Sequence, residues 1–295
     1  MKEFVVLADS VCDLDLKMRE KYGIDYVAMN YIIDEQEYVA SLDWEFHSAR
    51  EFYDFMRGGK RVFTTQVPKN VYYDKFKQCI DEGKDIVYIA CSSALSSSVK
   101  TAELVANELK EQYPDAGIYC VDSLISSLGQ GYLLFEAARL RDEGKSAKEA
   151  AEYIESIRLC VNQCGTVSSL DYLSRAGRVK ASKAFFGNLF GVKPIIISDI
   201  YGQNYAYKKA KGTQNARIAI AEHIADAADG VYENLYISHA DCIEDAEALR
   251  DEILKIAPFK NVHIGTIGPI VGASVGPGTV IAFCFGKQVT IGGQE

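Results

Sequence analysis

The sequence lacks the features that would place it in a membrane or on a nucleic acid. No stretch of its 295 residues approaches the roughly 20 consecutive apolar residues of a membrane span. Basic residues are in deficit, with 32 Lys and Arg against 41 Asp and Glu and a formal net charge of −9. Nucleic-acid binding draws its affinity from neutralised phosphates, and a basic face is what docks on anionic lipid. We therefore expect no nucleic-acid partner and no integral membrane contact.

The eight cysteines form neither a disulfide framework nor a metal-binding pattern. Most lie within apolar runs, where a reduced cysteine packs as a small core residue. Cys160 and Cys164 have helical spacing but no second pair to complete a metal site, so we interpret them as core residues. The apolar run within residues 1–10 is too short for a signal peptide and contains Asp9. These observations favour a reducing, cytoplasmic location and no bound metal.

The length and the apolar pattern indicate two domains, residues 1–145 and 146–295. In the first, apolar runs of about five residues alternate with helical patterns of about twelve. The runs predict strands over residues 4–8, 26–33, 86–90 and 117–121, and helices over 14–22, 49–57, 69–82, 98–113 and 132–143. Such alternation is typical of a parallel sheet covered by helices, so we predict a Rossmann-like α/β domain.

The second domain has a different pattern. A helix over residues 146–159 begins with a capping box, Ser146 and Glu149. Strand-like pieces then follow with only two further helices among them; the strands are expected at 165–168, 193–198, 204–208, 235–238, 262–267 and 280–285, and the helices at 214–228 and 243–256. We predict a mixed α+β domain, packed closely on the first because no long linker separates them.

Four loops rich in polar residues or glycine stand at the ends of predicted strands: residues 9–13, 64–68, 91–98 and 268–278. In a parallel α/β sheet, ligands bind outside the carboxyl ends of the strands. Each loop also has a simpler interpretation. Asp13 has the residue type of a helix N-cap, Thr64 and Thr65 suit a capping loop, and the glycines suit a tight crossing loop.

The third loop is the strongest candidate for a ligand site. Five of the eight residues in 91–98 are serine, between a buried strand and a long helix. A helix cap needs only one of them, and hydroxyls beside the amides of a helix N-terminus can bind a carboxylate or a phosphate. The loop does not end in the Gly-Lys-Ser/Thr of a nucleotide-binding P-loop.

Catalytic motifs are weak by comparison. The sequence has no G-x-S-x-G nucleophile elbow, although His239 and Asp241 follow a predicted strand and leave Ser/His/Asp chemistry open. A stand-alone serine hydrolase or phosphotransferase acting on a small anion is therefore the alternative function. The basic run 207–212, which includes Lys211, is either a solvated face or an edge that faces an anion.

Taken in order, the motifs resemble those of the DegV family, the fatty-acid-binding subunits of bacterial fatty acid kinase, over about residues 3–286. The matching pieces are Asp9-Ser10 with Asp13, Thr64-Thr65-Gln66, Ser92-Ser93-Ala94-Leu95-Ser96, Val121-Asp122-Ser123 with Gly129-Gln130-Gly131, residues 170–178, Gly191-Val192-Lys193-Pro194, His239-Ala240-Asp241 and residues 268–278. Each piece is weak alone, but their shared order is specific.

The resemblance implies a DegV-like fold of two α/β domains with one long-chain fatty acid between them. The acyl chain would occupy an apolar tunnel, and a separate kinase subunit would convert the bound acid to an acyl phosphate. The resemblance also implies that the protein has no catalytic residues of its own and no cofactor. A regulatory module that senses lipid would share the same site without a kinase partner.

The family motif carries over to individual residues. Ser93 and Thr64 would bind the carboxylate with Ser92 and Thr65 beside them, and Ser274 stands where the family usually carries a histidine. Arg178, in a turn that reads Ala176-Gly177-Arg178 rather than Gly-Gly-Arg, would lie with Lys211 at the site mouth or the kinase contact. Affinity for the fatty acid would come from burial of its acyl chain. Each buried methylene contributes about 0.8 kcal/mol of binding free energy, so sixteen contribute on the order of 13 kcal/mol before the cost of immobilisation.

Overall fold

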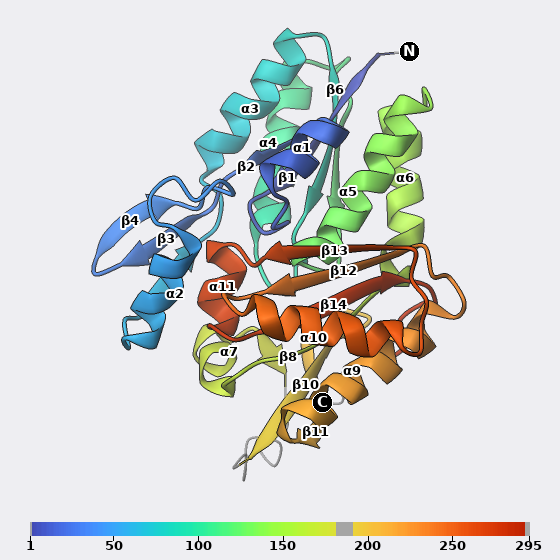
Figure 1. Ribbon diagram of the computed structural model, residues 1–295. Coiled ribbons are helices and arrows are strands. Elements are labelled where there is room, and N and C mark those ends of the chain that lie inside the picture. Colours follow the sequence, from blue (N-terminus) through green and yellow to red (C-terminus); the bar gives the residue numbers. More distant parts are fainter. Residues whose placement is uncertain (1, 181–190, 293–295) are drawn as a thin grey trace.

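The computed structural model describes residues 2–180 and 191–292, and these form two halves, one above the other in Figure 1. The upper, N-terminal half contains four parallel strands in the order β2-β1-β6-β7, which confirms the predicted parallel sheet. These strands are β1 (Phe4–Asp9), β2 (Ile24–Val27), β6 (Asp85–Ala90) and β7 (Ile118–Asp122). Their side chains are largely buried because helices cover both faces of the sheet.

The helices of this half are shared between the two faces. α3 (Lys69–Asp81) packs with α4 (Ser98–Gln112), whereas α5 (Ser127–Asp142) packs with both α1 (Leu16–Tyr22) and α6 (Ala147–Ile157). The expected boundary at residue 145 precedes α6, yet α6 packs on β6 and β7. Its buried stripe of alanines and Ile154 explains this position, and the chain reaches the second half only after Arg158–Cys160.

The expected single strand over residues 26–33 is wrong. The chain leaves the parallel sheet after β2 and forms a separate antiparallel sheet, seen at the left of Figure 1, in the order β4-β3-β5. It consists of β3 (Asn30–Ile33), β4 (Gln36–Val39) and β5 (Val62–Thr65), with α2 (Ala49–Arg57) beside it. Asp34 and Glu35 turn the β3–β4 hairpin with φ of 51° and 66°. Glutamate rarely adopts a positive φ. The turn also contains no Asn-Gly or Asp-Gly pair, so the sequence does not mark the hairpin.

The C-terminal half contains a mixed sheet in the order β13-β12-β14-β8-β10-β11-β9, with parallel pairs at both edges and antiparallel pairs between them. The predicted α+β arrangement is confirmed. The strands are β8 (Val161–Thr166), β9 (Val179–Lys180), β10 (Val192–Ser198), β11 (Asn204–Lys211), β12 (Asn234–His239), β13 (Asn261–Thr266) and β14 (Val280–Phe285).

Two long helices, α9 (Gly212–Ala228) and α10 (Ile243–Leu254), bury their apolar residues against one face of this sheet. The other face meets the N-terminal half, where Ile281 and Phe283 belong to the same apolar core as Leu128 of α5. The main core is therefore continuous across the boundary between the halves. No helix within the described ranges is both long and apolar enough to cross a membrane.

The glycine-rich segment 268–278, expected as a loop, contains the helix α11 (Pro269–Val275). Pro269 suits the first turn of a helix because that turn leaves its N–H groups unpaired. Gly272 lies against α2, since a Cβ at this position would come within 2.5 Å of Tyr53 Oη. This glycine thus permits a close contact between helices rather than a turn, a role that its neighbours in the sequence do not reveal.

Candidate ligand site between the two halves

A cavity of about 270 Å³ lies between the two halves, just beyond the carboxyl ends of β1 and β6. Part of its wall is apolar and consists of Val11, Met29, Cys91, Leu95, Ile270, Val271, Val275 and Ile281. The other part is polar and consists of Thr64, Thr65, Gln66, Ser96, Ser97, Ser126, Gln163, Arg178, Asn204 and Ser274. Both halves contribute to both parts, so the cavity exists only in the assembled fold.

The serine loop after β6 places two of the expected ligands outside the cavity wall. Ser92 is fully buried, and its Oγ accepts a hydrogen bond from the backbone N–H of Ala94 at 3.2 Å. Ser93 is exposed, and its backbone N–H donates to Asp122 Oδ1 at 3.0 Å. Neither serine lines the cavity: the Ser92 hydroxyl is bonded within the loop, and the Ser93 backbone is bonded to the end of β7.

Ser96 and Ser97 of the same loop line the cavity instead. Ser97 is the N-cap residue of α4 but makes no side-chain capping bond, and Ser96 Oγ lies 3.0 Å from Ser98 Oγ. The N–H groups and the dipole of a helix N-terminus favour an anion at this place. In the sequence, Ser96 and Ser97 stand directly before the predicted helix start at residue 98, and this position is the signal that identifies them as candidate ligands.

Thr64 and Thr65 close β5 rather than standing in a loop, and both line the cavity. They pair with Tyr31 and Asn30 of β3. The Thr65 hydroxyl donates to Glu37 Oε1 at 3.4 Å. Within the part of the chain that the structure describes, the Thr64 hydroxyl has no hydrogen-bond partner, so it is available to a ligand.

A second cavity, of about 300 Å³, adjoins the first and shares Thr64, Arg178 and Ser274 with it. Its lining carries four basic side chains, Lys60, Arg61, Arg175 and Arg178, and no acidic one. Lys60 is paired with Asp34 at 2.6 Å. The lining residues therefore leave a net positive charge beside the hydroxyl-rich end of the first cavity.

Arg178, Ser274 and Lys211 take different places around these cavities. The Arg178 guanidinium is exposed and donates from Nε to the backbone oxygen of Leu95 at 3.3 Å, so it lies over the serine loop. Ser274 is half-buried on α11 and faces both cavities. Lys211 ends β11 opposite Val192, is exposed, and lines neither cavity.

Asp9 is completely buried and positions the loops that follow β1 and β6. Its Oδ1 accepts from the Val11 N–H and from Gln130 Nε2, each at 3.1 Å. Its Oδ2 accepts from Tyr88 Oη at 3.1 Å and from the Cys91 N–H at 2.9 Å. Burial raises the pKa of Asp9, and the hydrogen bonds oppose that rise. The ends of β1 and β6 are thereby joined through a single carboxyl group.

Asp13 is not the cap of the next helix; that role belongs to Asp15, which accepts from the Met18 N–H at 2.8 Å. Asp13 is buried and crosses to the C-terminal half instead. Its Oδ1 accepts from the Gly268 N–H at 2.9 Å, at the start of α11, and its Oδ2 accepts from Ser127 Oγ at 2.5 Å. Burial, opposed by these bonds, raises the pKa of Asp13 to about 7.

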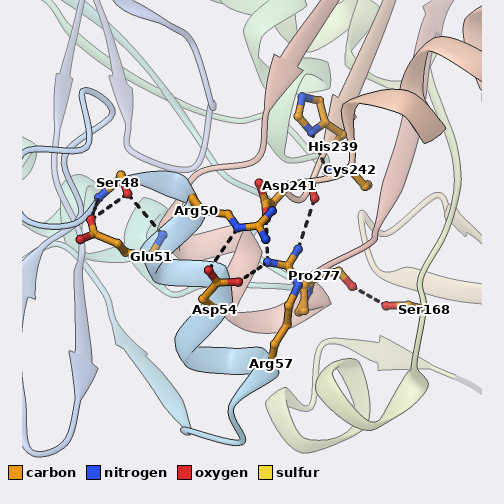
Figure 2. Close-up of polar contacts among 10 residues, drawn as sticks. All are labelled: Ser48, Arg50, Glu51, Asp54, Arg57, Ser168, His239, Asp241, Cys242 and Pro277. Atoms are coloured by element: carbon orange, nitrogen blue, oxygen red, sulfur yellow. Dashed lines mark hydrogen bonds and ion pairs between the residues drawn. The ribbon is translucent and has the colours of Figure 1, made fainter.

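An ion cluster forms a second connection between the halves (Figure 2). Arg57 of α2 contacts the Asp241 carboxylate at 2.6 Å and donates to its backbone oxygen at 3.2 Å. Arg50 approaches the same carboxylate at 3.4 Å, and Asp54 pairs with both arginines. These contacts hold α2 against the loop that follows β12.

His239 does not form a Ser/His/Asp arrangement with the described residues. Its Nδ1 accepts from the Cys242 backbone N–H at 3.2 Å, as Figure 2 shows, and none of the described serine hydroxyls hydrogen-bonds to it. Burial lowers the pKa of His239. The described residues also contain no group of three or more His, Cys, Asp or Glu side chains placed to hold a metal ion.

Fold and site together define a class: an α/β protein of two halves with a cavity between the polar strand ends of one half and the sheet of the other. A family model described as DegV family matches residues 3–287. A DegV domain-containing protein of Clostridium perfringens is 34% identical over 287 residues, which cover 97% of this chain and 98% of that one. The chain belongs to the DegV family.

Solved structures agree with this assignment. A DegV family protein from Thermus thermophilus, described by its fatty acid binding, superposes with a TM-score of 0.87 at 25% identity and covers 97% of this chain and 100% of its own. A stearic-acid-binding protein from Eubacterium ventriosum superposes with a TM-score of 0.86 at 22% identity, covering 96% and 98%. At 22% identity, the comparison with the Eubacterium ventriosum protein shows a shared fold and nothing more specific.

Proposed function

We propose that this protein binds one long-chain fatty acid in the cavity between its halves. The observation that carries the proposal is the division of one cavity wall into a hydroxyl-rich end and an apolar stretch. Fatty acid binding by the relative from Thermus thermophilus supports the same ligand class. A fatty acid needs both surfaces, because its chain gains free energy on burial and its carboxylate loses free energy unless it is hydrogen-bonded.

The carboxylate is proposed to lie among Thr64, Ser97 and Ser274, with the first turn of α4 and Arg178 nearby. Ser96 and Thr65 complete this polar end. Ser92 and Ser93, which the family motif implies as ligands, are proposed to support this polar end through the loop to which they belong. Each charge-assisted hydrogen bond to a carboxylate contributes about 1.5–3 kcal/mol.

The test is extraction of the purified, folded protein with organic solvent, followed by mass spectrometry of the extract and native mass spectrometry of the intact protein. We expect close to one long-chain fatty acid per chain. Recovery of none, together with no uptake when the protein is incubated with such acids, would overturn the proposal.

We further propose that the bound acid is presented to a separate kinase subunit, which forms the acyl phosphate in the cytoplasm. The basic lining of the second cavity supports this, because Arg61 and Arg175 lie where an anionic phosphoryl donor would approach the carboxylate. All eight cysteines are free thiols, which suits a reducing compartment. Acyl phosphate trapped as its hydroxamate should require ATP, the kinase and this protein together; formation without the kinase would favour a stand-alone enzyme.

A further inference from the structure

Gln163 and Asn204 form a polar pair in the wall of the ligand cavity. Gln163 Nε2 donates to Asn204 Oδ1 at 3.0 Å, and Asn204 Nδ2 donates to the backbone oxygen of Arg178 at 3.1 Å. Gln163 is only 5% exposed. A chain of hydrogen bonds therefore holds the Gln163 amide in one orientation at the cavity wall.

The surroundings of this amide are apolar. Gln163 stands in β8, and its cross-strand neighbour on β14 is Phe283. Val161 of β8, Phe283 and Ile281 of β14 belong to the core that joins the two halves. A glutamine amide on such a sheet face loses hydration without a packing advantage over a side chain such as leucine.

The pair also lies where the ligand cavity meets a smaller cavity. A small cavity of about 20 Å³ adjoins the ligand cavity and shares Gln163, Asn204, Val275 and Ile281 with it. Most of its remaining lining is apolar, including Val167, Leu173 and Ile196. Thr64 does not line this extension, so an acyl chain running from Thr64 into it passes the amide of Gln163.

The amide presents an acceptor on this route. Among the residues that the structure describes, the Gln163 side chain hydrogen-bonds through Nε2, and Oε1 is not one of the enclosed oxygen atoms that lack a partner, so this oxygen is open to the cavity. A methylene chain cannot satisfy that oxygen, whereas a hydroxyl group on the chain donates to it. A site with a buried polar group discriminates against ligands that leave the group unpaired.

We infer that this cavity selects fatty acids that carry a hydroxyl group partway along the chain, with that hydroxyl donating to Gln163 Oε1. The inference rests on the proposed function and narrows its ligand class. Gln163 is then a specificity-determining residue, and Asn204 is a positioning residue that orients its amide.

The test uses delipidated full-length protein and titration calorimetry with octadecanoic acid and a series of its monohydroxy isomers. We expect one isomer, or two adjacent ones, to bind about tenfold tighter than isomers with the hydroxyl several carbons away, the equivalent of one good hydrogen bond. Gln163→Met should weaken the preferred isomer about tenfold and leave the unsubstituted acid equal or tighter.

Gln203→Met is the matched control, because Gln203 is also a buried glutamine, adjoins Asn204 and lines neither cavity. It should keep the isomer preference. A series with no preferred isomer, or a preference that survives Gln163→Met, would overturn the inference, and the wild-type series decides even if the variant does not fold. In that outcome the unsubstituted acid still binds; binding of no acid at all overturns the proposed function instead.

Discussion

Asp13 and Asp241 each join the two halves of the molecule, yet they do so by opposite physical means. Asp13 is buried and accepts only from neutral donors, the Gly268 N–H and the Ser127 hydroxyl. Asp241 lies on a partly exposed surface and contacts the guanidinium groups of Arg57 and Arg50. The side chains of Arg57 and Asp241 are 36% and 20% exposed.

The difference shows that one side-chain type can form two kinds of connection. A carboxyl group that lacks a cation and is removed from water favours its protonated form, so the Asp13 contact responds to pH. An ion pair near the surface is screened by dissolved ions, so the Asp241 contact responds to salt. Solvent exposure and the partner, rather than the residue type, decide which condition matters.

The largest expected effect is the pH dependence of stability that Asp13 contributes. Its pKa of about 7 in the folded protein exceeds the ordinary 3.8, so the folded state binds more protons between those values. Stability should therefore fall as pH rises from about 4 to about 7 and then level off, by at most about 4 kcal/mol at pH 8. Urea unfolding at pH 5, 6, 7 and 8 measures this slope.

Asp13→Asn is the matched variant, because its amide accepts from the Gly268 N–H and donates to Ser127 Oγ without ionising. It should flatten the slope and be at least as stable as the wild type at pH 8. A slope identical to that of the wild type would show that other groups, such as the neighbouring Asp9, cause the dependence.

A somewhat smaller effect is expected for Asp13→Ala at pH 5. This variant leaves the buried Gly268 N–H and Ser127 hydroxyl without their acceptor, which costs about 1–3 kcal/mol per unmet group. Thermal and urea unfolding at pH 5 check the loss. Ser127 retains Ser238 Oγ at 2.9 Å, so a loss below 1 kcal/mol would mean that Ser238 and water replace the carboxyl group.

Ligand affinity separates the two connections further. Asp13 holds the N-terminus of α11, the helix that carries Ser274 and Ile270 of the cavity wall, whereas Asp241 contacts no wall residue in the cluster described above. Asp13→Ala should weaken fatty acid binding by about tenfold, roughly 1.4 kcal/mol. Arg57→Ala should change it by less than about threefold. Equal losses in displacement titrations would contradict this assignment.

The smallest expected effect is the stability change of Arg57→Ala. Exposed ion pairs contribute about 0.2–1 kcal/mol, and salt screens them. Unfolding at low and at high ionic strength should show a difference between variant and wild type that shrinks with added salt. A loss well above 1 kcal/mol that ignores salt would place the Arg57–Asp241 pair with the buried contacts.

Much of the fold was predictable because its signals are local. Continuous apolar runs identify β1, β6 and β7 as strands of a covered sheet, and the capping box of Ser146 and Glu149 marks the start of α6. The errors also have local causes. The β3–β4 hairpin turns through Glu35 at a φ of 66°, which the residue type does not suggest. The glycines of 268–278 suggest turns, whereas Gly272 serves the contact of α11 with Tyr53.

The candidate site was predictable as a set of loops but not as a set of side chains. The serine cluster does border the cavity, yet Ser96 and Ser97 line it while Ser92 and Ser93 do not. Nothing in the neighbouring residues states which hydroxyl faces the ligand, because that depends on the path of the loop. Gln163 carried no signal at all, since an isolated glutamine in a strand is an ordinary residue.

Residue order alone thus contains the alternation of strands and helices, the polar ends of those strands and the family motifs, all of which depend on neighbours a few positions apart. The closing of the site depends on pairs that are remote in sequence. Asp13 meets Gly268 across 255 positions, and Gln163 meets Asn204 across 41. The packing of the two halves brings Asp13 to Gly268, and the assembly of the C-terminal sheet brings Gln163 of β8 to Asn204 of β11. Removal from water then decides the charge of Asp13 and the partners that all four groups keep.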